Sequence, residues 1–295
     1  MNDKVCIIVI GHYPNSRSYK TMIKYVNMSY AVIVYNNGGV LKENIPSEYL
    51  ENIIIIGDGI NHGIGKAVNE SMLYAYKKGF KYAIILDQDS YIDNNSLTAL
   101  YEEIKDRKNI IICPLIYTKN SANNGSMYIV KKSRFKFKKE LVLPNEIKEV
   151  SIVITSGMFV PIREFLEVGG YDEELFIEGV DDEFCLKLNK FNKKIIVNGN
   201  AILYQQYGDL TKNMFLGITF YCTNHKPIRR YYIFRNKIII SKKYGFQYGY
   251  YIVFQFFSLL KMMLGILLFE KNKFNNFIMI CKGIRDGIFY TSKHT

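Results

Sequence analysis

Two carboxylates separated by one residue stand directly after an apolar run in the first third of the chain. Asp87 and Asp89 belong to an Asp-Gln-Asp-Ser stretch that follows the apolar residues 82–86. Carboxylate oxygens are hard ligands that suit Mg²⁺ or Mn²⁺, and an ion bound to such a pair can also bind a diphosphate. The alternative is a solvated acidic turn that caps the following helix.

A glycine-containing stretch opens the segment over residues 61–78, which is predicted to be helical. Its sequence is Asn-His-Gly-Ile-Gly-Lys-Ala, with Asn61, Gly63 and Lys66 as its candidate ligands. Glycines let a backbone approach a ligand closely, and a helix N-terminus favours an anion. The glycine spacing fits neither a Walker loop nor the dinucleotide fingerprint, and an ordinary glycine-containing loop remains the alternative.

Four carboxylates precede a short amphipathic helix predicted at residues 184–190. Glu178, Asp181 and Glu183 are among them. A carboxylate aimed into a cleft can act as general base toward a hydroxyl group. The alternative is that these side chains simply cap the helix, whose dipole stabilises negative charge.

Arginines open the C-terminal part of the chain, where Arg230 and Arg235 follow Pro227. Guanidinium groups bind diphosphates well. A basic helix that lies on a membrane is the alternative, and the two interpretations are compatible.

The segments that must position these residues predict an α/β fold. Apolar runs at residues 5–10, 31–35, 53–56 and 82–86 alternate with the predicted helices 17–28 and 61–78. This alternation is typical of a mostly parallel sheet, in which ligands bind at the carboxyl ends of the strands. The polar clusters fall at those ends. Later in the chain, we expect an exposed hairpin or loop at 118–148, β-type sequence at 151–160, and a strand at 194–197.

Positive charge is concentrated at one end of the chain. Of 39 Lys and Arg against 27 Asp and Glu, the whole excess of +12 falls in residues 211–295, which are also rich in Phe and Tyr. An anionic lipid or a phosphorylated substrate would explain this bias. The aromatic residues lie in apolar runs and not between basic ones, which argues against nucleic acid. The five scattered cysteines have no metal-ligand spacing, and with no recognisable secretion signal they indicate a reduced, cytosolic setting.

The segment over residues 246–269 is about long enough to span a bilayer. Gln255, Ser258 and Lys261 interrupt it, and a central lysine costs about 2.5–3.5 kcal/mol even on lenient scales. Helices lying in the membrane interface are therefore favoured over a span. Packing on the catalytic domain, or formation of a homodimer, remains the alternative.

Taken in order, these patterns resemble the family 2 glycosyltransferases, inverting enzymes of the GT-A fold, and in particular their bacterial rhamnosyltransferase-like branch. The resemblance covers nearly the whole chain. It implies a GT-A catalytic domain over residues 1–225, and a helical, membrane-associating region over 226–295. The motifs that carry it lie at residues 61–69, 86–90, 169–177, 180–187, 230–236 and 283–287.

The resemblance also implies roles for the donor-binding residues. Tyr13 and Asn36 would hold the base and ribose of a nucleotide-diphosphate sugar. Asp87 would contact the ribose or the metal, and Asp89 would bind the metal, Mg²⁺ or Mn²⁺, beside the diphosphate. The nucleotide pocket would be lined by Asn61, Gly63 and Lys66.

On the acceptor side, Asp181 would be the general base, and Glu183 would orient the acceptor or the base. Glu178 is the rival candidate for the base. Arg230 and Arg235 would stabilise the leaving diphosphate or bind a lipid pyrophosphate.

Two positions depart from the family pattern. Asn36 stands where the family usually has Asp, so a carboxylate near the base and ribose is lost. Gln205 stands where a His often helps to bind the metal, and an amide oxygen binds these ions less strongly than imidazole or carboxylate.

The resemblance therefore implies transfer of L-rhamnose from dTDP-rhamnose to a hydroxyl of a growing, lipid-linked cell-surface polysaccharide such as O-antigen or capsule. The enzyme would be cytoplasmic and peripheral on the inner face of the bacterial membrane, where the surface is anionic. One alternative is an inactive glycosyltransferase-like scaffold in a membrane glycan-assembly complex. Another is a nucleotidyltransferase, but residues 11–17 do not supply its glycine-rich, basic loop.

Overall fold

The computed structural model describes residues 4–40, 42–117, 126–205, 211–215, 217–222 and 225–291. Within it the chain divides into two compact units. The first comprises Met1–Val130, Lys139–Phe176 and Val180–Gln206, and the second comprises Lys131–Lys138, Ile177–Gly179 and Tyr207–Thr295. The second unit therefore takes in more of the chain than the C-terminal region that the sequence suggests from residue 226.

A mixed sheet forms the centre of the first unit. Its strands follow the order β3-β2-β1-β4-β10-β6-β11-β5, with β9 also paired to β11. The strands are β1 (Val5–Gly11), β2 (Ala31–Asn36), β3 (Ile53–Ile56), β4 (Tyr82–Asp87), β5 (Tyr91–Ile92), β6 (Ile110–Tyr117), β9 (Ile147–Val150), β10 (Phe159–Pro161) and β11 (Lys194–Tyr204).

The first four strands and the β6–β11 pair confirm the parallel α/β prediction, whereas β5, β9 and β10 run antiparallel to their neighbours. Strands β3, β2, β1 and β4 are parallel, whereas β10 runs antiparallel to both β4 and β6. Strands β5 and β9 are antiparallel to β11. Of the expected β-type stretch at 151–160, only Phe159 and Val160 enter this sheet, as part of β10 and without a crossover helix.

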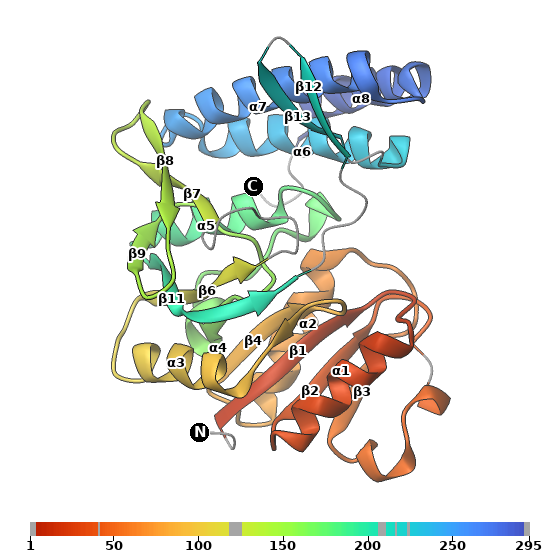
Figure 1. Ribbon diagram of the computed structural model, residues 1–295, viewed down its shortest axis with the longest axis vertical. Helices are drawn as coiled ribbons and strands as arrows, with labels where there is room; N and C mark the ends of the chain where they lie inside the picture. Colours follow the sequence, from red (N-terminus) through yellow and green to blue (C-terminus); the bar gives the residue numbers. More distant parts are fainter. Residues whose placement is uncertain are drawn as a thin grey trace. The chain divides into compact units, whose positions relative to one another are not determined.

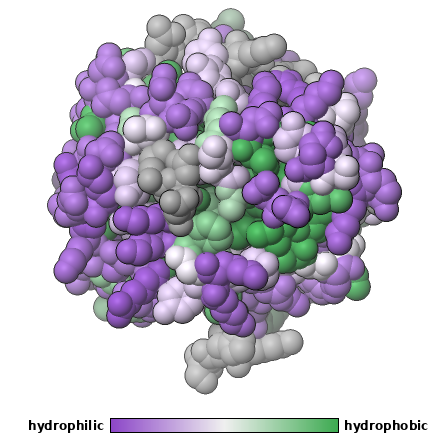
Figure 2. Space-filling view, turned by 90° about the horizontal axis from the view of Figure 1, so that it is seen from below, coloured by the Kyte–Doolittle hydropathy of each residue, from purple (hydrophilic) through white to green (hydrophobic). Residues whose placement is uncertain are grey.

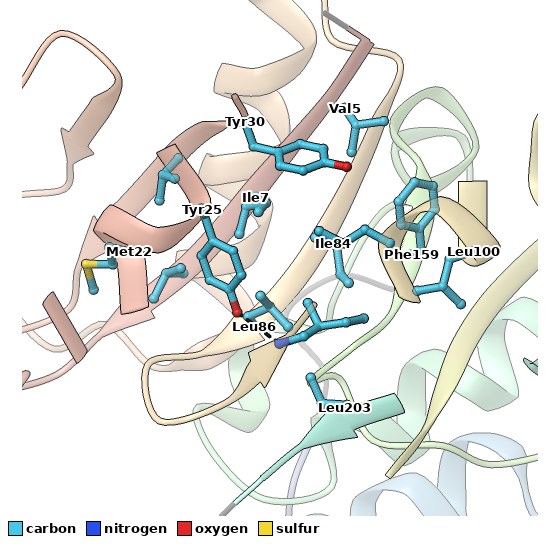
Figure 3. Packing of buried hydrophobic residues seen from close by; sticks show 14 of the residues in the cluster. Val5, Ile7, Met22, Tyr25, Tyr30, Ile84, Leu86, Leu100, Phe159 and Leu203 are labelled. Atoms are coloured by element: carbon cyan, nitrogen blue, oxygen red, sulfur yellow. Dashed lines mark hydrogen bonds between the residues drawn. The ribbon is translucent and has the colours of Figure 1, made fainter. Parts of the chain in front are cut away.

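Helices cover both faces of this sheet, which is why its central strands are apolar on both sides (Figure 1). Side chains of α1 and α3 pack on one face with Val5, Ile7 and Ile84 (Figure 3). The other face carries α2, in contact with β1 and β2. The helices of the first unit are α1 (Ser16–Asn27), α2 (Ile64–Lys77), α3 (Asn94–Ile104), α4 (Ile162–Glu167) and α5 (Val180–Lys190).

Tyr25 of α1 ties the core to the loop that follows β4. Its hydroxyl group accepts a hydrogen bond from the backbone N–H of Ile92, at 3.2 Å (Figure 3), and lies 3.4 Å from the carbonyl oxygen of Ser90, to which it donates. Because buried polar groups are costly when unpaired, this pair of bonds fixes the backbone just after the Asp-Gln-Asp stretch.

Two short hairpins complete the strands. Strands β7 (Ser126–Lys131) and β8 (Phe137–Val142) form the hairpin expected within 118–148, although residues 118–125 lie outside the described residues. Strands β12 (Thr211–Phe215) and β13 (Ile218–Cys222) form the other.

Three helices make up most of the second unit: α6 (Pro227–Tyr244), α7 (Gly249–Phe269) and α8 (Lys273–Ile288). Helices α6 and α8 approach closely because glycines lie at their contact. A Cβ atom on Gly283 would lie 2.4 Å from the carbonyl oxygen of Tyr231, and one on Gly287 would lie 2.8 Å from that of Arg235. The motif at residues 283–287 therefore has a packing role.

Much of the surface is polar. Seen from below, the molecule is mostly hydrophilic, and apolar side chains come to the surface chiefly in one patch (Figure 2). The large exposed apolar side chains of α7 belong to the second unit and are taken up below.

Candidate functional site

Three aspartates form one acidic cluster at the carboxyl end of β4. Burial and, to a smaller extent, the charge of Asp89 raise the pKa of Asp87 to about 6, against hydrogen bonds with Ser156 and Gln205 that lower it. Burial, with smaller contributions from the charges of Asp182 and Asp87, raises the pKa of Asp181 to about 7, against hydrogen bonds with Thr155 that lower it. Asp87 thus interacts with both Asp89 and Asp181, and the predicted metal ligands and the predicted base meet in one place.

Hydrogen bonds from two neighbouring elements hold this cluster. The Gln205 Nε2 group donates to Asp87 Oδ2 at 2.9 Å, and the Ser156 hydroxyl accepts from the backbone N–H of Asp87 at 3.2 Å. The hydroxyl group of Thr155 donates a short hydrogen bond to Asp181 Oδ1. Thr155 was not predicted as a site residue. The only feature of the sequence that points to it is its position before Ser156 and Gly157 in the β-type stretch at 151–160.

The raised pKa of Asp181 predicts a dependence of stability on pH. A carboxyl group whose pKa is higher in the folded than in the unfolded protein stabilises the fold below the unfolded value, and this contribution is lost as pH rises through about 7. In metal-free protein, Asp181→Asn should therefore raise the free energy of unfolding by about 3 kcal/mol at pH values near 8. Urea unfolding of both proteins across the pH range measures the difference, which should vanish below the unfolded pKa. A constant difference at every pH would contradict the assignment.

Glu183 is paired with another residue of its own helix. Its side chain is fully buried on α5 and pairs with Lys187, with Nζ and Oε2 3.4 Å apart. Lys187 in turn donates to the carbonyl oxygen of Gly170 at 2.6 Å. These contacts favour a structural role for Glu183 over direct contact with an acceptor.

Tyr13 lies in the loop that follows the carboxyl end of β1. It is 72% exposed, and its backbone has a φ of 48°. Its ring lies against Gly39, where an added Cβ would be 2.4 Å from Tyr13 Cδ1. An exposed aromatic ring braced on a glycine turn is available to stack on a base.

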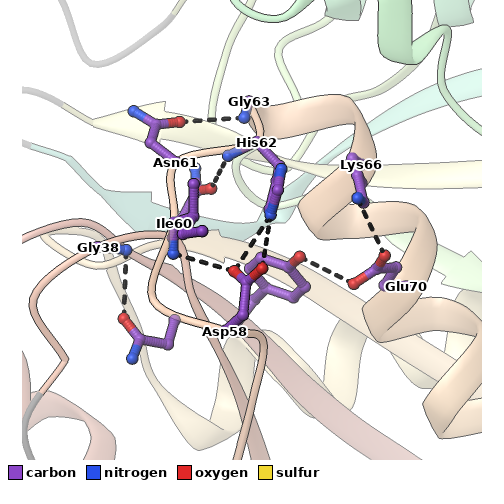
Figure 4. A network of polar contacts seen from close by, with 11 residues as sticks. Gly38, Asp58, Ile60, Asn61, His62, Gly63, Lys66 and Glu70 are labelled. Atoms are coloured by element: carbon purple, nitrogen blue, oxygen red, sulfur yellow. Dashed lines mark hydrogen bonds and ion pairs between the residues drawn. The ribbon is translucent and has the colours of Figure 1, made fainter.

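The side chain of Asn36 forms hydrogen bonds within its own turn. Its Oδ1 atom accepts a hydrogen bond from the backbone N–H group of Gly38 at 3.2 Å (Figure 4), and another from that of Val40 at 3.1 Å. The next residue, Asn37, reaches the glycine loop instead, and its Oδ1 accepts from the N–H of His62 at 2.9 Å. Asn36 therefore shapes the turn, and the missed residue Asn37 joins that turn to the loop.

Gln88 provides a second link that the sequence did not single out. Its Oε1 accepts from the backbone N–H of His12 at 2.8 Å, and its Nε2 donates to the carbonyl oxygen of His12 at 3.0 Å. The paired bonds hold the end of β1 against the loop of Asp87 and Asp89. Its only sequence signal was its position between the two aspartates.

The loop at 61–63 is organised by short local bonds. Asn61 Oδ1 accepts from the N–H of Gly63 at 3.0 Å, and His62 Nε2 contacts Asp58 at 2.9 Å (Figure 4). Lys66 points along α2 toward Glu70, with Nζ and Oε1 3.7 Å apart. Glu70 also accepts from the hydroxyl of Tyr35 at 2.8 Å, so Lys66 is partly neutralised where it stands.

Gly63 is required by the geometry of this loop. Its φ is +87°, and an added Cβ would lie 2.5 Å from the carbonyl oxygen of Phe176. Gly63→Ala should therefore lower the free energy of unfolding by about 3 kcal/mol, since it adds a clash to the strain of a positive φ.

Gly79→Ala is the matched control. Gly79 has a φ of +85° but nothing within 4 Å of an added Cβ, so only the strain of about 1 kcal/mol should remain. Equal losses of stability in urea unfolding would show that the contact with Phe176 is unimportant.

The candidate arginines and Glu178 belong to the second unit. Arg230 is 2% exposed and forms a buried ion pair with Glu270, which is 3% exposed. Arg235 lies with its guanidinium carbon 5.5 Å from the ring centre of Tyr290. Glu178 pairs with Arg229 through two hydrogen bonds. The burial of Arg230 leaves it no surface on which to meet a diphosphate.

The donor set at the acidic cluster suits a hard divalent cation. Asp87 and Asp89 offer carboxylate oxygens, and the buried Gln205 Oε1 has no hydrogen-bond partner within the described part of the chain. Over those same residues, no group of three or more His, Cys, Asp or Glu side chains is arranged to hold a metal, so an amide oxygen would have to complete the set. Such a set fits Mg²⁺ or Mn²⁺ better than a soft metal.

Comparison with known proteins shows which proteins this chain resembles. Residues 26–167 match the family described as Glycosyl transferase family 2. The dTDP-rhamnosyl transferase RfbF of Shigella flexneri is 27% identical over 246 residues, which span 82% of this chain and 81% of that protein.

Two solved structures show the same fold. GalNAc-T7, crystallised with UDP, GalNAc and Mn²⁺, has a TM-score of 0.62 at 15% identity, over 84% of this chain and 50% of its own. This chain thus spans half the length of GalNAc-T7. S. aureus TarS 1-349 in complex with UDP-GlcNAc has a TM-score of 0.55 at 15% identity, over 97% of this chain and 80% of its own. The chain therefore has the GT-A fold, and its residues 26–167 match a glycosyl transferase family 2 domain.

Proposed function

We propose that this protein is an inverting glycosyltransferase that moves L-rhamnose from dTDP-rhamnose to a hydroxyl group of a lipid-linked, growing cell-surface polysaccharide. The observation that carries the proposal is the acidic cluster, in which Asp181 lies close enough to Asp87 for their charges to interact. The family match and the relation to a rhamnosyl transferase support glycosyl transfer from a nucleotide sugar. RfbF also motivates the choice of donor.

The donor would lie across the carboxyl ends of β1, β2 and β4. The exposed ring of Tyr13 would stack on the base, beside the turn that Asn36 shapes and the loop of Asn61. Gly63 and Lys66 would border the nucleotide at the start of α2. Asp87, Asp89 and Gln205 would hold Mg²⁺ or Mn²⁺. When bound, such an ion neutralises the charge that develops on the leaving diphosphate.

Asp181 would accept the proton of the acceptor hydroxyl. As that oxygen forms its bond to the anomeric carbon, the bond from this carbon to the diphosphate oxygen breaks, and the electron pair leaves with the nucleotide. One displacement on the face opposite the leaving group inverts the anomeric configuration. A carboxyl group with a pKa near 7 is well matched to proton transfer at neutral pH.

Glu178 is weaker as a base. Two donors of Arg229 bind its Oε1 atom, so this oxygen is already engaged in an ion pair. We keep Arg235 as a candidate for binding a pyrophosphate, whereas Arg230 is assigned to the ion pair with Glu270.

A donor screen tests this function. The purified protein is incubated with a panel of nucleotide sugars, with Mn²⁺ or with a chelator, and release of the nucleoside diphosphate is measured. We expect release from dTDP-rhamnose that depends on the metal, and NMR of the transferred product should show an inverted anomeric centre. An inactive scaffold would release nothing from any donor, with or without acceptor.

We also propose that the second unit binds the anionic inner face of the cell membrane. Helix α7 is the one helix within the described residues that is long and apolar enough to cross a bilayer, and only 17% of its most apolar window is buried. Its exposed side chains include Phe256 (63%), Phe257 (61%) and Leu267 (62%). An exposed apolar helix in a basic segment fits an interfacial position.

Vesicle binding tests this position. We expect the protein to remain partly bound to anionic vesicles in about 1 M salt, because apolar insertion is not screened as charge attraction is. Phe256→Ser/Phe257→Ser should lower the bound fraction several-fold, whereas Phe191→Ser, at a half-exposed site on the first unit, should not. If the double variant instead turns a dimer into a monomer and binds vesicles normally, the face is a dimer contact.

A further inference from the structure

The first unit contains a second feature, most of whose residues have no role in the donor site. A cavity of about 760 Å³ opens between α1 and the ends of β5, β6 and β11. Asp89 and Gln205 lie on its border, so it adjoins the acidic cluster. The volume is in the range of pockets that enclose a small ligand.

One wall of the cavity is basic. Arg17, Lys20 and Lys24 lie three and four residues apart on α1 and therefore share one face of the helix. None of the three has a carboxylate oxygen within salt-bridge distance over the described residues. Asp93, on the opposite side, is engaged as the N-cap of α3, where it accepts from the N–H of Ser96 at 2.7 Å. The wall thus offers three cations to an anion.

The facing wall is aromatic. Tyr91 and Tyr204 lie with ring centres 6.3 Å apart and planes tilted by 30°, and Tyr117 meets Tyr204 at 5.6 Å and 65°. Tyr117 is 39% exposed and Tyr204 is 42% exposed, although both are large rings. Lys24 Nζ lies 5.2 Å from the ring centre of Tyr91 and joins the two walls. Exposed tyrosine rings present an apolar face and a hydroxyl group, which suit a sugar ring.

We propose that this cavity is an acceptor subsite for a sugar that carries an anionic group. The lysines and Arg17 would bind the anion, and the tyrosines would contact the sugar ring. The position beside Asp89 would then bring the acceptor to the metal side of the donor. The inference rests on the proposed glycosyl transfer. The anion has two sources, the diphosphate of a lipid-linked acceptor or a carboxylate on a sugar of the glycan, and the experiment separates them.

Calorimetric titration tests binding without requiring turnover. The probes are a short alkyl diphosphate-linked N-acetylglucosamine, glucuronic acid and inorganic pyrophosphate. We expect the wild-type protein to bind one of the two sugar probes, and Lys20→Gln/Lys24→Gln to weaken that binding by about tenfold or more. Preference for the alkyl diphosphate sugar identifies the lipid-linked source, and preference for glucuronic acid identifies the glycan. Tyr117→Ala should weaken binding of the preferred sugar probe but leave pyrophosphate unaffected.

Lys78→Gln is the matched control. Lys78 Nζ lies 5.5 Å from the ring centre of Tyr74, so it reproduces the lysine–tyrosine contact on α2, outside the cavity. It should leave all affinities unchanged. In turnover assays, Lys20→Gln/Lys24→Gln should raise the KM for acceptor and leave the KM for donor unchanged.

Two results would overturn the subsite. The first is unchanged binding of both sugar probes to the double lysine variant. The second is an equal loss of dTDP affinity, which would assign the cavity to the donor. Probe binding by a protein that transfers no sugar would support the subsite and refute the proposed function, so the two failures are distinguishable.

Discussion

Asp181→Asn should lower the turnover number for sugar transfer by about a thousandfold, because a positioned general base contributes roughly 10²–10⁴ to a rate. The substitution keeps the size of the side chain and can still accept the hydrogen bond from Thr155. Affinity for dTDP, measured by calorimetry, should change by less than about threefold, since the base acts on the acceptor and not on the nucleotide.

Two neighbouring carboxylates serve as controls for Asp181. Asp182→Asn removes the adjacent charge on the same turn of α5, and its turnover should stay within a few-fold of wild type. Glu178→Gln removes the rival base and frees Arg229 from its ion pair. A thousandfold loss in Glu178→Gln, with near-normal turnover in Asp181→Asn, would transfer the role to Glu178.

The first half of the fold was predictable because its signals are local. Residues 5–10 and 82–86 are apolar at every position, and such runs, separated by helices, occur in parallel sheets covered on both faces. The polar residues that follow them had to meet at one edge of the sheet. This geometric rule is why the Asp-Gln-Asp stretch could be expected near the end of β1, where Gln88 is hydrogen-bonded to His12.

The roles of individual side chains were harder to predict from the sequence, because they depend on partners far away along the chain. Arg230 was predicted to bind a diphosphate. Instead it forms a buried ion pair with Glu270, which lies forty residues further along the chain. Thr155 reaches the acidic cluster from the turn before β10, and Gln205 from the residue that follows β11. The short antiparallel β10 was also beyond reach, since three residues carry no periodicity.

The second large effect is expected at the metal ligands. Asp89→Asn should weaken dTDP binding in the presence of Mn²⁺ by about 100-fold, because the amide removes one of only two carboxylates in the proposed set. With a chelator present, wild type and variant should bind dTDP equally weakly. Calorimetry measures both affinities, and the EPR signal of free Mn²⁺ reports metal binding without nucleotide or turnover. Asp106→Asn, an exposed substitution outside the site, controls for loss of a surface charge.

A substitution at Gln205 tests the same metal ligands by strengthening Mn²⁺ binding instead of weakening it. Its Oε1 is buried without a partner over the described residues, a costly arrangement that a bound cation would relieve. Imidazole binds Mn²⁺ more strongly than an amide oxygen does, so Gln205→His should tighten Mn²⁺ binding even though it removes the hydrogen bond to Asp87. If Mn²⁺ affinity were unchanged in both Asp89→Asn and Gln205→His, the ion would not bind at this cluster. The two carboxylates would then act on the donor directly, and the raised pKa of Asp87 would place its titration near neutral pH in the working enzyme.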